Sequence, residues 1–81
     1  MRTYMRGRLS LVQEERFQLV DDRGVAHLFL VAPDVSLKPA DLRDILRSGQ
    51  PVRVEYEEAP TLIAHIAKAI HAEPALEEPS Q

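Results

Sequence analysis

Residues 36–57 read SLKPADLRDILRSGQPVRVEYE and contain the clearest structural pattern of the chain. The first half of this stretch predicts a helix over residues 36–48, because the large apolar side chains recur at intervals of three and four residues. Gly49 is typical of the residue that ends a helix. Residues 52–57 then alternate between apolar and charged side chains, which predicts a strand with one buried face. A single helix that leads directly into a strand is the feature around which the other segments are arranged.

Three strands are predicted before this helix. Residues 4–12 and 16–20 each alternate between apolar and polar side chains, as half-buried strands do. Gly7 lies inside the first of them and indicates a bulge or a sharp bend. Residues 25–31 are all apolar except His27, so we expect both faces of this third strand to be covered.

The segment after the helix and strand is ambiguous. Residues 62–70 fit the period of a strand and the period of a helix equally well. We favour the strand, because a strand that ends at an acidic loop needs a hairpin partner. Residues 73–81 contain three Glu and two Pro, and we expect a disordered acidic tail after a single domain at residues 1–72.

Length and composition narrow the class of protein. A chain of 81 residues with 44% hydrophobic residues forms one small globular domain, with about 3–5 kcal/mol of stability. The absence of Cys excludes disulfides and cysteine zinc sites. The chain has no apolar run long enough to span a membrane and no secretory leader, so we expect a cytoplasmic protein without a membrane partner.

The predicted element order is three strands, one helix and two strands. Together with Gly7 and the phrase GQPVRVEY, residues 49–56, this order resembles the OB-fold, a five-stranded barrel that binds oligonucleotides and oligosaccharides. The resemblance covers residues 3–71. We therefore expect a mainly β, OB-like barrel with its helix between the third and fourth strands. The resemblance implies that a ligand lies across the second and third strands, between the first–second and fourth–fifth loops.

Nucleic-acid binding is the function that the resemblance suggests first, and the charge pattern disfavours it. The two loops that would flank the ligand carry four carboxylates, which repel phosphates: Glu14, Glu15, Glu57 and Glu58. Six basic or aromatic side chains favour it: Tyr4, Arg6, Arg8, Arg16, Phe29 and Arg53. Single-stranded nucleic-acid binding by this set is our alternative function.

Catalytic and metal-binding residue types occur without the spacing that such sites need. His65 and His71 are six residues apart, which fits neither a strand pair nor a helical HExxH pair. The sequence contains no GxSxG, GxGxxG or GKS/T motif. We therefore expect no enzymatic activity, no metal site and no cofactor.

The third predicted strand carries the most informative functional signal. The outward face of a solvated barrel strand is normally polar, whereas both faces of residues 25–31 are apolar. Either the chain's own helix or a loop covers the outward face, or another protein chain does. We expect Leu28 and Leu30 to face inward, and an outward contact made by His27, Phe29 and Val31. The predicted function is a non-enzymatic binding or adaptor module that associates with a protein partner or forms a homo-oligomer.

Overall fold

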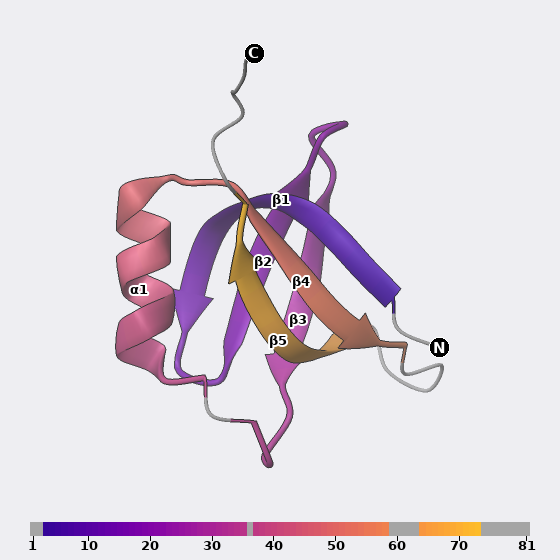
Figure 1. Cartoon of the computed structure of the whole chain (residues 1–81), viewed down its shortest axis with the longest axis vertical. Coiled ribbons are helices and arrows are strands. Elements are labelled where there is room, and N and C mark those ends of the chain that lie inside the picture. The colour runs from indigo at the N-terminus through magenta and orange to yellow at the C-terminus, as the bar shows by residue number, and fades with distance from the viewer. Residues whose placement is uncertain (1–2, 36, 59–63, 74–81) are drawn as a thin grey trace.

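The computed structural model describes residues 3–35, 37–58 and 64–73. Five strands and one helix follow one another in the predicted order (Figure 1). They are β1 (Thr3–Gln13), β2 (Arg16–Asp21), β3 (Ala26–Val31), α1 (Pro39–Ser48), β4 (Val52–Glu57) and β5 (His65–Ala72). The strands close into a barrel in the order β1-β2-β3-β5-β4. This arrangement confirms the prediction of a small, mainly β, OB-like barrel with its helix between the third and fourth strands.

The segment that the sequence left ambiguous forms a strand. β5 pairs antiparallel with β4 along most of its length and parallel with β3 over three residues. It begins at His65, and residues 59–63 lie outside the described residues. Residues 74–81, most of the predicted tail, also lie outside them. Glu73 is described, and its backbone N–H donates a hydrogen bond to the carbonyl oxygen of Pro51 at 3.0 Å.

β1 curves strongly (Figure 1) and pairs with two neighbouring strands. It changes partner at Gly7, which lies opposite Val52 of β4 and Asp21 of β2. Its first half pairs with β4 and its second half with β2. A Cβ atom on Gly7 would lie 2.2 Å from the carbonyl oxygen of Val20, so only glycine allows this approach of the two backbones. An irregular register between Leu9 and Leu11 then leaves Leu11 44% exposed, and Val12 packs against the core. A bulge at Gly7 is one of the two predicted alternatives, and the register irregularity of β1 lies instead between Leu9 and Leu11.

The helix ends at Ser48, as its sequence predicts, and begins at Pro39, later than the predicted start. Pro39 occupies the first helical turn, and Gly49 adopts a left-handed φ of 69° after the last turn. The N–H of Gly49 lies within hydrogen-bond distance of the carbonyl oxygens of Ile45 and Leu46. Leu42 is buried in the barrel core, and the helix packs against β1. α1 therefore closes the side of the barrel next to β1 rather than the outer side of β3.

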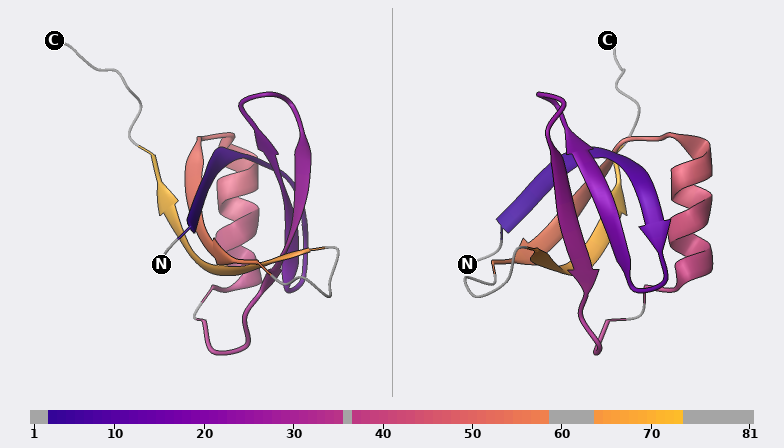
Figure 2. Two further views of the ribbon diagram at one scale, coloured as in Figure 1. Left: turned by 90° about the vertical axis from the view of Figure 1, so that its right-hand side faces the viewer. Right: turned by 180° about the vertical axis from the view of Figure 1, so that it is seen from behind.

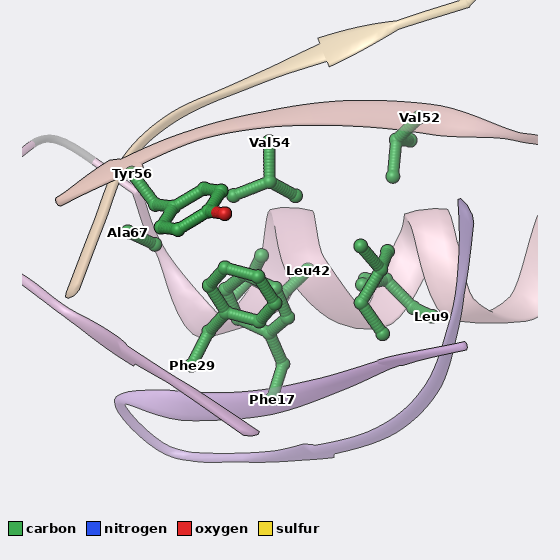
Figure 3. Packing of buried hydrophobic residues seen from close by; sticks show 9 residues of the cluster. Leu9, Phe17, Phe29, Leu42, Val52, Val54, Tyr56 and Ala67 are labelled. Carbon is green, nitrogen blue, oxygen red and sulfur yellow. The ribbon is translucent and has the colours of Figure 1, made fainter. Parts of the chain in front are cut away.

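Large apolar side chains fill the barrel interior (Figure 3). The rings of Phe17 and Phe29 are stacked, with centroids 5.1 Å apart and planes 6° apart. Phe29 also meets Tyr56 edge to face, at a centroid distance of 5.5 Å. The buried cluster consists of Leu9, Phe17, Leu19, Phe29, Leu42, Val52, Val54, Tyr56 and Ala67.

The predicted orientation of β3 is wrong. The register between β2 and β3 places Phe29 opposite Phe17 and Leu28 opposite Gln18, and Phe29 has no exposed surface. Because successive strand side chains alternate between faces, this pairing reverses the whole strand. The inward set is His27, Phe29 and Val31, and the outward set is Ala26, Leu28 and Leu30. The physical reason is that an aromatic ring fills the barrel interior better than Leu28 or Leu30, in a chain that has few aromatic residues.

Candidate functional site

The three residues predicted to contact a partner lie on the inner side of β3. Phe29 belongs to the core, and Val31 packs against it. The Nε2 atom of His27 lies 2.8 Å from Oδ2 of Asp21, within hydrogen-bond distance. A protein contact centred on Phe29 needs that ring at the surface, and the fold buries it.

A cluster of histidine and aromatic rings surrounds Phe29 inside the barrel. The ring centroid of His65 lies 4.6 Å from that of Tyr56, 5.1 Å from that of Phe29 and 6.0 Å from that of His27. Burial, together with the nearby His27, lowers the pKa of His65, and burial raises the pKa of Tyr56. The hydrogen bond from His27 lowers the pKa of Asp21. The described residues contain no group of three or more His, Asp or Glu side chains that could hold a metal ion.

The outward surface of β3 is apolar, and the side chains next to it on β2 are mixed. Ala26, Leu28 and Leu30, with Val20 of β2 and Ile66 of β5, form an apolar set that we call the β3 face, and the polar side chains of Gln18 and Arg16 lie opposite Leu28 and Leu30. The strand register places Val20 beside Ala26 and Leu30 beside Ile66. In the view from behind, β2 and β3 lie at the front and α1 lies to one side (Figure 2, right). Within the described part of the chain, the β3 face is therefore not covered by the helix.

A hollow of about 460 Å³ adjoins the β3 face at one end. Leu30 and Ile66 line it together with Pro33, and the charged side chains of Glu14 and Arg16 also border it. An apolar floor bordered by charged groups is typical of the surfaces that proteins use to bind one another.

The four loop carboxylates lie at this same end of the barrel. Glu57, Ile66, Leu30 and Arg16 form one row of paired residues across β4, β5, β3 and β2. Glu58 follows Glu57 at one end of this row, and Glu14 and Glu15 precede Arg16 at the other end. The predicted repulsion of phosphates therefore concerns the end of the β3 face at Leu30 and Ile66. This is the end at which the OB-fold resemblance implies a ligand.

Four of the six residues predicted to bind nucleic acid gather elsewhere. Tyr4, Arg6, Arg8 and Arg53 lie on the outer side of β1 and β4, and we call this surface the arginine face. Arg6 and Arg53 are paired across the two strands. The guanidinium of Arg53 lies 4.7 Å from the centre of the Tyr4 ring, which is the geometry of a cation–π contact.

The other two residues of that set lie away from the arginine face. Phe29 is in the core, so it provides no stacking surface for a base. Arg16 lies four residues along β2 from Val20, the partner of Arg8, which corresponds to about 13 Å. Arg16 instead lies opposite Leu30, beside the charged end of the β3 face.

Two hollows lie along the arginine face. One, of about 560 Å³, is lined by Arg6 and Arg8, and the other, of about 390 Å³, by Tyr4, Arg6 and Arg53. Asp21 and Asp22 line both hollows, so their charge is mixed. The arginine face is a continuous surface with positive charge from β1 and β4 and negative charge from the β2–β3 turn.

A carboxylate also lies on the arginine face. Glu73 places one oxygen 3.4 Å from Nε of Arg6 and the other 3.9 Å from Nε of Arg53. The Glu73 side chain is only 19% exposed. The predicted arginine set is therefore assembled in space, and it is partly neutralised by the chain itself.

Comparison of the chain with protein-family models, with curated proteins and with solved structures finds no match. The description as an OB-like barrel rests on element order and barrel closure. In residues 3–35, 37–58 and 64–73, no helix is long and apolar enough to cross a membrane.

Sequence reasoning missed two parts of these surfaces. It placed Leu28 and Leu30 inside the barrel, and the length of the β2–β3 turn is the signal that could have corrected this. That turn sets the register and hence the face of each side chain. It also assigned Glu73 to the tail, and no local pattern marks Glu73 as a partner of Arg6, because the two are far apart in the sequence.

Proposed function

We propose that this protein is a cytoplasmic, non-enzymatic binding module that associates with another protein chain through the β3 face. One observation carries the proposal: Leu28 and Leu30 point outward on a strand that α1 leaves uncovered. An outward strand face made only of apolar side chains serves a solvated barrel poorly and suits an interface.

The energetic support comes from the size of the apolar groups. Complete burial of one Leu side chain contributes about 1.5–3 kcal/mol. Leu28 and Leu30 are already partly buried, so a partner chain recovers a fraction of this for each, and Val20 and Ile66 extend the contact. The partner is a second copy of the chain or a protein with a matching apolar surface.

The test measures association of purified protein by sedimentation over a wide range of concentrations. The double variant Leu28→Asp/Leu30→Asp should stay folded and remain monomeric where the wild type associates. Val25→Asp is the matched control, because Val25 is 50% exposed at the hairpin turn and lies outside the β3 face. A double variant that associates like the wild type contradicts the proposed surface.

A monomeric wild type would exclude self-association, and the partner would then be a different protein with a matching apolar surface. A photo-cross-linking residue at position 28 should then capture a protein that the same residue at position 25 does not. Equal capture at both positions would contradict a specific β3-face contact.

The second candidate function is binding of single-stranded nucleic acid on the arginine face. The observation that favours it is the convergence of Tyr4, Arg6, Arg8 and Arg53 along two adjacent hollows. Fluorescence polarisation with a labelled oligodeoxythymidine tests this function. Binding at low salt that weakens steeply as salt rises supports it, because phosphate contacts release counterions. No binding at low salt contradicts it.

A further inference from the structure

A carboxylate of the chain itself, that of Glu73, lies against two arginines of the arginine face. Its two carboxylate oxygens approach Nε of Arg6 and Nε of Arg53, the paired arginines at the centre of the arginine face. Its backbone continues the β4–β5 ladder through the hydrogen bond to Pro51, which fixes where the side chain starts. The fold therefore holds the backbone of Glu73 beside this surface, whereas its carboxylate is attached there by charge.

The contacts that Glu73 makes are longer than those an oxyanion ligand can make. Charge-assisted N–H···O bonds to guanidinium are about 2.7–2.9 Å long. The two distances here are 3.4 Å and 3.9 Å, and Nε of Arg53 is buried and has no hydrogen-bond partner among the described residues. A phosphate bound directly to these groups makes shorter bonds than Glu73 does, so it can replace the carboxylate.

We propose that Glu73 is an intramolecular competitor of nucleic-acid phosphate for Arg6 and Arg53. The inference rests on the second candidate function and concerns how that site is regulated. In the free protein the carboxylate neutralises both arginines. In the complex a phosphodiester takes its place beside the Tyr4 ring, and Glu73 turns to solvent.

The test compares variants of the full chain in their binding to a fluorescein-labelled oligodeoxythymidine across a series of salt concentrations. Glu73→Gln keeps the size of the side chain and the backbone bond to Pro51 but removes the charge. We expect it to bind about three- to tenfold more tightly than the wild type at low salt, since two partly exposed ion pairs no longer compete with the phosphate. In the wild type, rising salt also weakens the ion pairs of Glu73, which offsets part of the salt dependence of the one phosphodiester contact. Without those ion pairs the slope of log K against log salt should steepen, by at most about 0.7.

Glu57→Gln is the matched control. It makes the same change in net charge on the outer side of β4, and Glu57 is exposed and lies four residues along the strand from Arg53. It should leave the salt slope unchanged. If Glu57→Gln and Glu73→Gln tighten binding equally with unchanged slopes, the effect is long-range charge and the competition is refuted.

Two further outcomes separate this inference from the function on which it rests. The double variant Arg6→Gln/Glu73→Gln should lose most of the gain, and a retained gain overturns the role of Arg6. A wild type and a Glu73→Gln variant that bind equally refute the competition and leave nucleic-acid binding intact. If no variant binds at low salt, the candidate function itself is contradicted and the inference is overturned with it.

Discussion

Replacement of Gly7 by Ala tests the closest backbone contact in the barrel with a single methyl group. At a position without a positive φ, Gly→Ala normally stabilises a protein by about 0.4–1 kcal/mol, because it restricts the unfolded chain. Gly7 is such a position. Here, however, the new Cβ would lie 2.2 Å from the carbonyl oxygen of Val20, 2.9 Å from its carbonyl carbon and 3.1 Å from Cγ of Leu19. The structure therefore predicts the opposite sign.

The size of the loss follows from what has to move. The Val20 atoms are backbone, so the two strands must separate by about 1 Å to reach ordinary contact distances. That separation weakens the ladder around the Gly7–Asp21 and Arg8–Val20 pairs, at about 0.5–1.5 kcal/mol per hydrogen bond. Displacement of Leu19 in the packed core adds about 1–3 kcal/mol. We expect a total loss of about 2–4 kcal/mol, a large part of the stability of a domain this small.

Urea denaturation followed by far-ultraviolet circular dichroism measures this loss. The midpoint for Gly7→Ala should fall by more than about 1 M relative to the wild type. Gly49→Ala is a useful comparison, because its Cβ meets no atom within 4 Å and its effect comes only from the left-handed φ of 69°. A Gly7→Ala variant as stable as the wild type would refute the close approach of β1 to β2.

Two further predictions concern the barrel interior. Phe29→Ala removes the ring that stacks on Phe17 and should cost about 3–5 kcal/mol, enough to unfold most of the protein. Leu28→Ala shortens a half-buried side chain and should lower the melting temperature clearly less; a Phe29→Ala variant as stable as Leu28→Ala would contradict the core position of Phe29. Because the pKa of His65 is lowered in the fold, the neutral ring is favoured there, so its contribution to stability is present above the ordinary pKa of 6.5 and is lost as the pH falls below it. The melting temperature should therefore decrease from pH 7 to pH 5, and this decrease should be smaller in His65→Gln; identical pH profiles for the two proteins would contradict this role of His65.

The candidate sites were only partly predictable from the sequence. Alternation correctly placed Tyr4, Arg6 and Arg8 on one outward face, because a period of two is visible along a half-buried strand. It did not show that Arg53 joins them while Arg16 does not, since that depends on which strands are neighbours and in which register. The acidic loops were identified correctly, yet their gathering at the far end from Arg6 follows from the closed barrel and not from their spacing.

The order of the elements follows from local rules that act over a few residues of the amino-acid sequence. Alternating apolar residues define the strands, and Pro39 and Gly49 define the helix ends. The direction in which β3 faces and the contact of Glu73 with Arg6 depend on the assembled barrel. A strand that is apolar on both sides has no alternation that shows which side faces inward. Its inward side therefore depends on the strand register and on how well each side chain fills the core. Contacts between residues far apart in the chain have no local signal, because barrel closure alone brings them together.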